Sequence, residues 1–290
     1  MPRDFRTWDT VIAPDPSYPI HRGAPLIAGA EVVTYRAHED VPPGEAVAEA
    51  LQKARARGTP AKLVIANYPQ NPTGRAASHG ELADLVGVVA KSGAFLLHDL
   101  AYADFDFSNR YAPSIFNCGL PAAEVARFGV EAFSMSKSYN MPGWRIAFLA
   151  GNQRLIGALA HLKSYMDYGT FAPLQYAAAW ALANGDKFVD DIRELYQERA
   201  VSLSSGLRAA GWDVKEPQGT MFLWARLPPE WQHLTSLEAG VRLLEQAKVA
   251  VSPGSGFGPG GEGYVRFALV EERERILQAC ERIGKELRAQ

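Results

Sequence analysis

The sequence has few of the residues that mark disulfide frameworks, metal sites or membrane spans. It contains 290 residues but only two cysteines, Cys118 and Cys280, whose wide separation fits neither a disulfide framework nor a metal motif. Its six histidines form no HxxH or HExxH pattern, so no metal site is expected. The N-terminal stretch MPRDFRTWDT lacks the apolar core of a signal peptide, and no later apolar run reaches membrane-spanning length. These absences favour a soluble protein of the reducing cytoplasm.

The chain also lacks an excess of charge of either sign. Its formal net charge is −2 and its pI is about 6.3. The densest basic run, Gln52 to Gly58, has the pattern of a solvated helix end. Nothing in this balance would attract a nucleic acid. By contrast, 47% of the residues are hydrophobic, which is enough for a core in one large or two ordinary domains.

Short apolar runs alternate with helix-like stretches in the first half of the chain. The runs, each bounded by turn residues, are TVIAP, KLVIANYP, AFLLHD and VEAFSMS. A helix is predicted between Ser78, a plausible N-cap, and Gly93, a plausible C-terminal glycine, and another over residues 44–58. Fully apolar strands that alternate with helices are typical of an open, mostly parallel α/β sheet.

After Arg145 the pattern becomes more helical and ends in a smaller α+β lobe. Helix-period and strand-like stretches follow in this order: PLQYAAAWALANG, DKFVDDIRELYQERAVSLSSGLRAAG, MFLWARL, SLEAGVRLLEQAKV, YVRFALV and EERERILQACERIGKELRAQ. We place a domain boundary near Asn184 and Gly185. The predicted domains are a large domain of residues 1–184 and a small C-terminal domain of residues 185–290.

Polar side chains recur where the predicted strands end. Ligands of open α/β sheets bind outside the carboxyl ends of the strands. Tyr18, Asn71, Asp99 and the segment from Ser134 to Lys137 all fall at such ends. Strand ends are also ordinary turn sites, so position alone leaves both interpretations open.

Lys137 lies in the stretch SMSKSYNMPGWR, directly after an apolar run. A charged lysine is costly to bury, so this amine should be paired, exposed or chemically engaged. The hydroxyls of Ser134 and Ser136 and the charged fork of Arg145 would suit a phosphate beside an imine-forming amine. A surface lysine that extends its amine into water is the alternative, and spacing alone does not decide between them.

Asp99, Tyr102 and Asn71 have both a chemical and an ordinary interpretation. Asp99 could face a pyridinium nitrogen and keep it protonated, while Tyr102 and Asn71 could bind an oxygen on the same ring. The ordinary alternatives are a hydrogen-bonded turn aspartate, a half-buried tyrosine with its hydroxyl in water, and a turn-forming Asn-Pro pair.

Arg266 lies inside the strand-like run YVRFALV. It would either face solvent from an edge strand or clamp a carboxylate with its two-pronged fork, and the pattern alone favours solvent. The preceding stretch GSGFGPGGEG contains GxGxxG twice, starting at Gly256 and Gly258. It leads into a strand instead of following one, so we interpret it as a mobile turn beside the site and not as a dinucleotide fingerprint.

Taken in order, these motifs resemble those of the pyridoxal-phosphate-dependent aminotransferases of class I/II, fold type I. The resemblance runs from about Asp9 to the C-terminus and is carried by NYPQNPTG, HDLAYADF, SMSKSYNMPGWRIAF and YVRFAL. The bacterial glutamate–pyruvate (alanine) transaminase branch is most similar, although diaminopimelate and methionine transaminases share many of these sequence motifs. The resemblance implies pyridoxal 5′-phosphate as cofactor, a homodimer, and exchange of an amino group between alanine or glutamate and a 2-oxo acid.

The resemblance also implies a role for each residue around the cofactor ring. Lys137 would bind the cofactor aldehyde as an imine and later move the proton at the substrate Cα. Asp99 would pair with the pyridinium nitrogen, and Asn71 and Tyr102 would bind the phenolic oxygen. Tyr18 would stack on the ring.

The remaining implied roles concern the phosphate and the substrate. Ser134 and Arg145 would hold the phosphate, with Ser136 as an additional contact. Arg266 would clamp the substrate α-carboxylate, beside Asn71.

One departure from the family pattern concerns the N-terminus. Family members begin well before DTVIAPDPSYP, with an arm, a first strand and a Gly-Ser/Thr loop whose amides hold the phosphate. This sequence begins at MPRDFRTW, as a shortened chain, a misassigned start or a damaged gene would. We therefore expect weaker cofactor binding and a weaker dimer than in a complete relative. The alternatives to a transaminase are a C–S lyase on the same fold, an inactive fragment, and a cofactor-binding regulator, which the lack of an appended DNA-binding segment disfavours.

Overall fold

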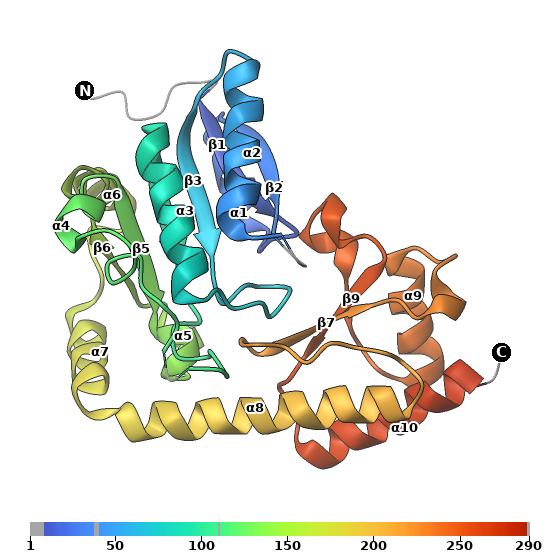
Figure 1. Cartoon of the computed structure of the whole chain (residues 1–290). Helices are drawn as coiled ribbons and strands as arrows, with labels where there is room; N and C mark the ends of the chain where they lie inside the picture. Colours follow the sequence, from blue (N-terminus) through green and yellow to red (C-terminus); the bar gives the residue numbers. More distant parts are fainter. Residues whose placement is uncertain (1–8, 38–40, 110, 289–290) are drawn as a thin grey trace.

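The structure, a computed structural model, describes residues 9–37, 41–109 and 111–288, so the predictions that rest on MPRDFRTW lie outside the described residues. The first part of the chain forms a six-stranded sheet in the order β2-β1-β3-β4-β5-β6 (Figure 1). Its strands are β1 (Thr10–Asp15), β2 (Glu31–Arg36), β3 (Ala61–Asn67), β4 (Phe95–Asp99), β5 (Gly129–Ser134) and β6 (Ala147–Gly151). All neighbours pair in parallel except β5 and β6. The predicted α/β class with a mostly parallel sheet is confirmed.

Helices connect and cover these strands. They are α1 (Ile20–Ile27), α2 (Pro43–Ala56), α3 (His79–Ser92), α4 (Ala122–Val125), α5 (Met135–Ser138), the 3₁₀ turn η1 (Pro142–Trp144), α6 (Gln153–Met166) and α7 (Ala172–Asn184). Both ends predicted for α3 are confirmed. The Ser78 hydroxyl accepts a hydrogen bond from the Glu81 amide at 3.2 Å, and Gly93 ends the helix with φ 80°.

A second sheet forms in the C-terminal part of the chain, in the order β7-β9-β8. The elements here are α8 (Asp186–Ala209), β7 (Phe222–Arg226), η2 (Pro229–Trp231), α9 (Ser236–Arg242), the π-helix η3 (Leu243–Ala247), β8 (Ser252–Pro253), η4 (Gly254–Phe257), η5 (Pro259–Gly261), β9 (Tyr264–Ala268) and α10 (Arg273–Arg288). Arg266 is therefore on the central strand of this sheet. The alternative of a solvent-facing edge residue is wrong, because strands pair on both sides of β9.

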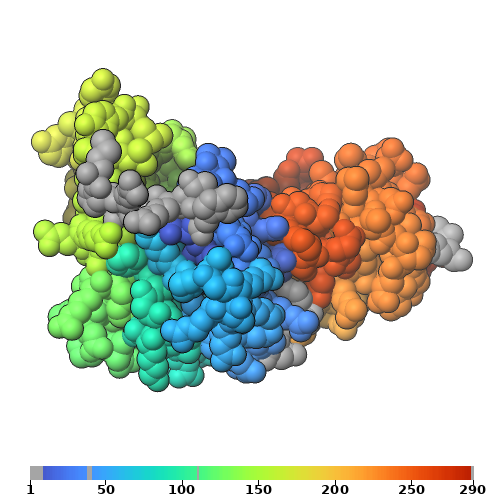
Figure 2. Space-filling view, turned by 90° about the horizontal axis from the view of Figure 1, so that it is seen from above, coloured from blue at the N-terminus to red at the C-terminus, as the bar shows by residue number. Residues whose placement is uncertain are grey.

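Each sheet has its own buried core. The first contains apolar side chains of α2, α3 and the strands beneath them, among them Val47, Leu82 and Leu96. The second is built around Trp212 and Trp231 and includes Leu207 near the end of α8. Figure 1 shows α8 running from the first part of the molecule to the second, and Figure 2 shows the two parts side by side, blue to green and orange.

The glycine-rich stretch connects the small sheet to the end of β1. The Gly260 amide donates a hydrogen bond to Asp15 Oδ1 at 3.0 Å, and the Ser17 amide donates to the Phe257 carbonyl at 2.8 Å. Gly258 has φ 121°, and a Cβ there would collide with the side chains of Asp15 and Arg22. The glycine-rich stretch itself forms the two 3₁₀ turns η4 and η5, and the strand β9 follows it, which fits the rejection of a dinucleotide fingerprint. Its mobility stays a prediction.

Among the described residues, no helix has both the length and the hydropathy of a membrane span. Cys118 and Cys280 are buried, unpaired thiols in the two separate cores. Burial raises the pKa of each to about 11.

A largely buried carboxylate joins β5 to a neighbouring loop and to β4. Glu131 lies 2.8 Å from His98 Nδ1, and it accepts hydrogen bonds from the Ser114 hydroxyl at 2.6 Å and the Ile115 amide at 2.7 Å. Although burial opposes ionisation, these contacts hold the pKa of Glu131 below its usual value. The Glu131 carboxylate therefore stabilises the pairing of β5 with β4, the strand that ends at Asp99.

Replacing Glu131 with glutamine should destabilise the fold in a pH-dependent way. A carboxylate with a lower pKa in the folded state adds stability above its unfolded pKa, and this stability is lost as pH falls through the folded pKa. We expect Glu131→Gln to lower the free energy of unfolding at pH 7 by about 1–3 kcal/mol. The loss should shrink as the pH is lowered into the range where Glu131 protonates, measured by urea denaturation at several pH values. Glu281→Gln, at an exposed position, is the matched control; equal losses in the two variants would contradict the assignment.

Candidate active site

The parallel strands β3, β4 and β5 end in polar residues at one edge of the large sheet: Asn67, Asp99 and Ser134. Asn67 and Asp99 lie opposite each other in the register, and Asn67 Nδ2 donates to the Asp99 carbonyl at 2.8 Å. This is the edge where an open α/β sheet binds its ligands.

Asp99 is held by contacts on both carboxylate oxygens. Its Oδ2 lies 2.8 Å from Nε2 of His21, a buried side chain on α1, and its Oδ1 accepts from the Ala101 amide at 3.1 Å. The Asp99 side chain keeps 23% exposure, so it can still meet a ligand. Sequence reasoning missed His21. Its only signal is its place three residues after Tyr18, and in the structure the two rings pack edge to face at 5.7 Å.

Asn71 brings the two lobes together. Its backbone N–H donates a hydrogen bond to Asn67 Oδ1 at 3.1 Å. Its side-chain oxygen accepts a hydrogen bond from Arg266 Nη1 at 2.7 Å. Arg266 lies on β9 of the small sheet, so this hydrogen bond crosses from one lobe to the other.

Arg266 is a largely desolvated cation without an anionic partner among the described residues. Its guanidinium lies 3.8 Å from the ring centre of Phe222 and 4.5 Å from that of Phe257. Burial lowers its pKa to about 10, and Nε is buried with no hydrogen-bond partner in the described parts of the chain. A site of this kind suits an incoming carboxylate.

Lys137 extends its amine into the same region. Nζ lies 5.8 Å from the ring centre of Tyr102, and the amine is half-buried. Burial and then the charges of Arg145 and Arg266 lower the pKa of Lys137. Such an amine is more often neutral, and so more nucleophilic, than a lysine in water.

Tyr102 is almost completely buried, at 4% exposure, beside Lys137. Burial raises the pKa of its hydroxyl; the charge of Arg266 opposes this increase, and Asp99 and Tyr18 add to it. Because Asp99 and Tyr18 of the large lobe and Arg266 of the small lobe all change this pKa, Tyr102 lies near residues from both lobes. Tyr18 itself is 43% exposed.

The three residues expected at a phosphate lie in the segment around Lys137, between the end of β5 and the residue after η1. The Ser134 hydroxyl accepts from the Ser136 amide at 3.2 Å. Arg145 is exposed, has φ 53°, and donates from Nη1 to the Pro142 carbonyl at 2.8 Å. Its charge is close enough to Lys137 to affect the amine.

The structure thus places the residues that sequence reasoning selected in one region, where the strand ends of the large sheet meet the small sheet. The residues are Tyr18, Asn71, Asp99, Tyr102, Ser134, Ser136, Lys137, Arg145 and Arg266. The donor set fits pyridoxal phosphate: an amine of lowered pKa for the aldehyde, a carboxylate for the ring nitrogen, and hydroxyls with a cation for the phosphate. Among the described residues, no group of three or more His, Cys, Asp or Glu side chains could hold a metal ion.

Comparison with known proteins adds a second kind of support. The family model described as aminotransferase class I and II matches residues 4–283. The glutamate-pyruvate aminotransferase AlaC of Escherichia coli (strain K12) is 44% identical over 282 residues, covering 97% of this chain and 66% of that protein. The LL-diaminopimelate aminotransferase of Moorella thermoacetica is 34% identical and covers 96% of this chain and 69% of its own length.

Solved structures agree with the sequence relatives. An aromatic aminotransferase from Pyrococcus horikoshii OT3 superposes with a TM-score of 0.88 at 26% identity, covering 99% of this chain and 75% of that one. The chain spans about two thirds of the length of the curated relatives that it matches. On the family match, the shared fold and the arrangement of Lys137, Asp99 and Arg266, this chain belongs to the class I and II aminotransferases.

Proposed function

We propose that the chain is a pyridoxal-phosphate-dependent aminotransferase that exchanges an amino group between L-alanine or L-glutamate and a 2-oxo acid. The observation that carries the proposal is the half-buried Lys137 amine, of lowered pKa, near the desolvated Arg266 cation. The 44% identity to a glutamate-pyruvate aminotransferase supports this pair of substrates.

Arg266 would bind the substrate α-carboxylate. Its Nη1 is already oriented by Asn71, and its unpaired Nε is available for a second hydrogen bond to the ligand. Because burial between two aromatic rings removes water from the guanidinium, a carboxylate would be held more strongly here than at an exposed arginine. This contact fixes the substrate Cα relative to Lys137.

Lys137 would accept the proton from the substrate Cα and return it to the product. A base must be neutral to accept a proton, and the lowered pKa of Lys137 favours the neutral amine. When bound, pyridoxal phosphate supplies an electron-withdrawing ring that stabilises negative charge at the substrate Cα.

Asp99 would keep the proton on the cofactor ring nitrogen. An ionised carboxylate stabilises a protonated nitrogen, and the contact with buried His21 fixes the orientation of that carboxylate. Tyr102 and Asn71 would donate to the ring oxygen, and Tyr18 would cover the ring. Ser134, Ser136 and Arg145 would hold the phosphate.

Two further expectations stay proposals. We place the chain in the cytoplasm, a reducing compartment, which suits two buried and unpaired thiols. We also keep the domain boundary near Asn184 and Gly185, where α7 ends and α8 begins.

Removing the charge of Arg145 should make the Lys137 amine less reactive. Because a nearby positive charge disfavours protonation of an amine, Arg145→Met should raise the pKa of Lys137 and shift its reactivity to higher pH. The measurement is imine formation with pyridoxal, which has no phosphate for Arg145 to bind, followed by absorbance across pH. Arg145→Lys keeps the charge and serves as the control. A midpoint that does not move in Arg145→Met would argue against the electrostatic coupling.

Lys137→Ala should abolish both cofactor attachment and amine transfer. We expect borohydride to fix pyridoxal phosphate on the Lys137 peptide of the wild type and on no peptide of the variant. Transfer from L-glutamate to pyruvate should fall by at least about 10³-fold. Retained turnover in Lys137→Ala would exclude the proposed mechanism. Release of ammonia from L-alanine without an acceptor would point to a lyase instead.

An exposed aromatic surface on α6 and α7 supports the homodimer expected for this family. The exposed side chains on and between these helices are Tyr165 at 74%, Tyr168 at 93%, Phe171 at 70%, Tyr176 at 76% and Trp180 at 67%. Monomers rarely expose so large an apolar patch, so we propose that a second copy of the chain covers it.

Polar substitutions in this surface should therefore weaken self-association. We expect the wild type to sediment with about twice the monomer mass of 31.6 kDa, and the double variant Tyr176→Ser, Trp180→Ser to shift towards the monomer. Leu237→Ser, at an exposed apolar position on α9, is the control. A wild type that stays monomeric at high concentration, with or without pyridoxal phosphate, would exclude this interface.

A further inference from the structure

One buried side-chain amide joins the two strand ends that carry much of the candidate active site. Asn67 is the last residue of β3, and only 1% of it is exposed. In the parallel register it pairs with Asp99, the last residue of β4. A buried polar side chain is costly unless its hydrogen-bonding groups are satisfied. The proposed chemistry gives Asn67 no role, so its contacts show what this side chain does.

Asn67 uses both ends of its side-chain amide. Its Nδ2 donates to the Asp99 carbonyl at 2.8 Å and to the Pro69 carbonyl at 3.3 Å. Its Oδ1 accepts from the backbone N–H of Asn71 at 3.1 Å. A carboxamide offers two N–H donors and an acceptor oxygen on one rigid plane, so these three contacts share one orientation. The side chain therefore fixes the backbone of Asp99 relative to the backbone of Asn71.

Asp99 and Asn71 serve opposite ends of the proposed ligand. Under the proposed function, Asp99 faces the ring nitrogen of the cofactor, whereas Arg266 binds the α-carboxylate of the substrate. The side-chain oxygen of Asn71 accepts from Arg266 Nη1 at 2.7 Å. A shift of the Asn71 backbone would therefore move the group that orients this guanidinium.

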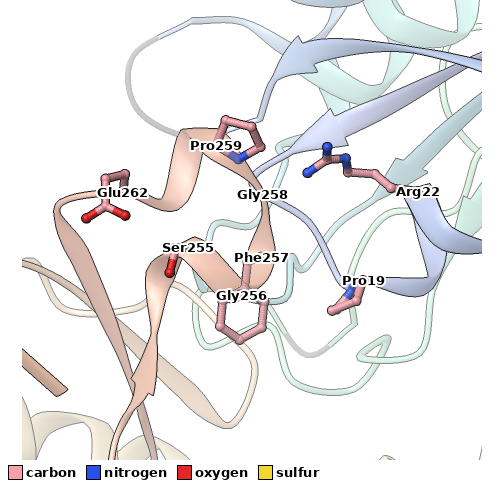
Figure 3. A pocket seen from close by; sticks show the side chains of 8 residues that line it. All are labelled: Pro19, Arg22, Ser255, Gly256, Phe257, Gly258, Pro259 and Glu262. Carbon is pink, nitrogen blue, oxygen red and sulfur yellow. The ribbon is translucent and has the colours of Figure 1, made fainter. Parts of the chain in front are cut away.

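A second contact of Arg266 does not depend on this amide. The ring centre of Phe257 lies 4.5 Å from the guanidinium. Figure 3 shows Phe257 in the glycine-rich stretch, opposite Pro19 and Arg22 of the large lobe. Phe257 covers the face of the guanidinium, whereas the hydrogen bond to Asn71 directs Nη1. A displaced Asn71 would thus leave Arg266 in place but without this orientation.

We infer that Asn67 is a positioning residue, which sets the separation between the group that faces the cofactor ring nitrogen and the group that orients the substrate carboxylate. This inference rests on the proposed function and goes beyond it, because it assigns the alignment of the two ends of the ligand to a single side chain. Asn67 acts through the backbones of Asp99 and Asn71 and takes no part in proton transfer.

The test removes the hydrogen bonds of Asn67 without adding charge. Asn67→Leu keeps a similar volume, and Asn67→Ala leaves room for water if the leucine variant does not fold. Circular dichroism confirms that each variant used is folded.

Asn152, which caps α6 away from these strand ends, provides the matched control. It is also buried, and it has the same set of contacts: two donated hydrogen bonds, to the carbonyls of Ala126 at 3.0 Å and Arg127 at 2.7 Å, and one accepted from the Leu155 amide at 3.1 Å. Asn152→Leu and Asn152→Ala should therefore cost similar stability without moving the site.

The first readout is the visible absorbance of the chain with added pyridoxal phosphate, titrated with pH. A proton on the ring nitrogen disfavours a second proton on the imine of Lys137, because like charges repel. If loss of the Asn67 contacts moves Asp99 away from the ring nitrogen, that proton is held less firmly and the imine titrates at higher pH. We expect the midpoint to rise by about one pH unit in the Asn67 variants and to stay within about 0.2 in the Asn152 variants.

The second readout needs no cofactor. Calorimetry measures the binding of propanoate, a simple carboxylate, to the chain alone. Because Nη1 loses its orientation, affinity should fall by about fivefold or more in the Asn67 variants and stay within about twofold in the Asn152 variants. Arg266→Met should abolish binding, which shows that the measurement reports this site.

Equal behaviour of the Asn67 and Asn152 variants would overturn the inference. A change in only one of the two readouts would also overturn it, because the inference requires both ends of the site to lose their alignment. If only the inference fails, the wild type transfers the amine from L-glutamate to pyruvate and the two sets of variants behave alike. If only the proposed function fails, the wild type transfers no amine, yet the absorbance midpoint and the propanoate affinity still depend on Asn67.

Discussion

The hydrogen bond from Arg266 to Asn71 is the contact on which the arrangement of the site depends. It joins the central strand of the small sheet to the loop after β3, and it does so with a guanidinium that two aromatic rings shield from water. A desolvated cation costs free energy unless it is satisfied, and the structure satisfies it only in part. The missing anionic partner is the reason why we propose this position as a carboxylate-binding site.

The unneutralised charge of Arg266 also affects the protonation of Lys137. Arg266 and Arg145 both disfavour a proton on the Lys137 amine, in addition to the effect of burial. A carboxylate that bound Arg266 would neutralise one of these charges. Under the proposed function, substrate binding and the protonation of the amine would therefore be coupled through charge, without any need for a conformational change.

Much of this arrangement could be predicted from the sequence, because the relevant signals are local. Alternation of apolar runs with helical stretches predicted β1, β3, β4 and β5, and the Ser78 and Gly93 signals predicted the ends of α3. The strands β2 and β6 were not predicted. They are the two outer strands of the sheet: β2 mixes polar with apolar residues, and the apolar β6 leaves most of its side chains exposed.

The contacts between the lobes could not be predicted in this way. The pattern around Arg266 favoured solvent, because strand alternation does not show which strand is central in a sheet or which loop of the other lobe lies above it. His21 was missed for a similar reason: its partner Asp99 is 78 residues away in the sequence. The family resemblance corrected the interpretation of Arg266, but it named no role for His21.

The 24-residue helix α8 has a consequence for how the two lobes can move. It is about 36 Å long if it is regular, and its N-terminal half lies with the large sheet while its C-terminal half belongs to the core of the small one. Because one continuous helix spans this junction, no flexible linker is present there to permit free rotation of one lobe relative to the other. Such a rotation must bend the helix or shift its side chains against their neighbours, so the stiffness of α8 limits how far Arg266 on the small sheet can move away from Lys137 on the large lobe.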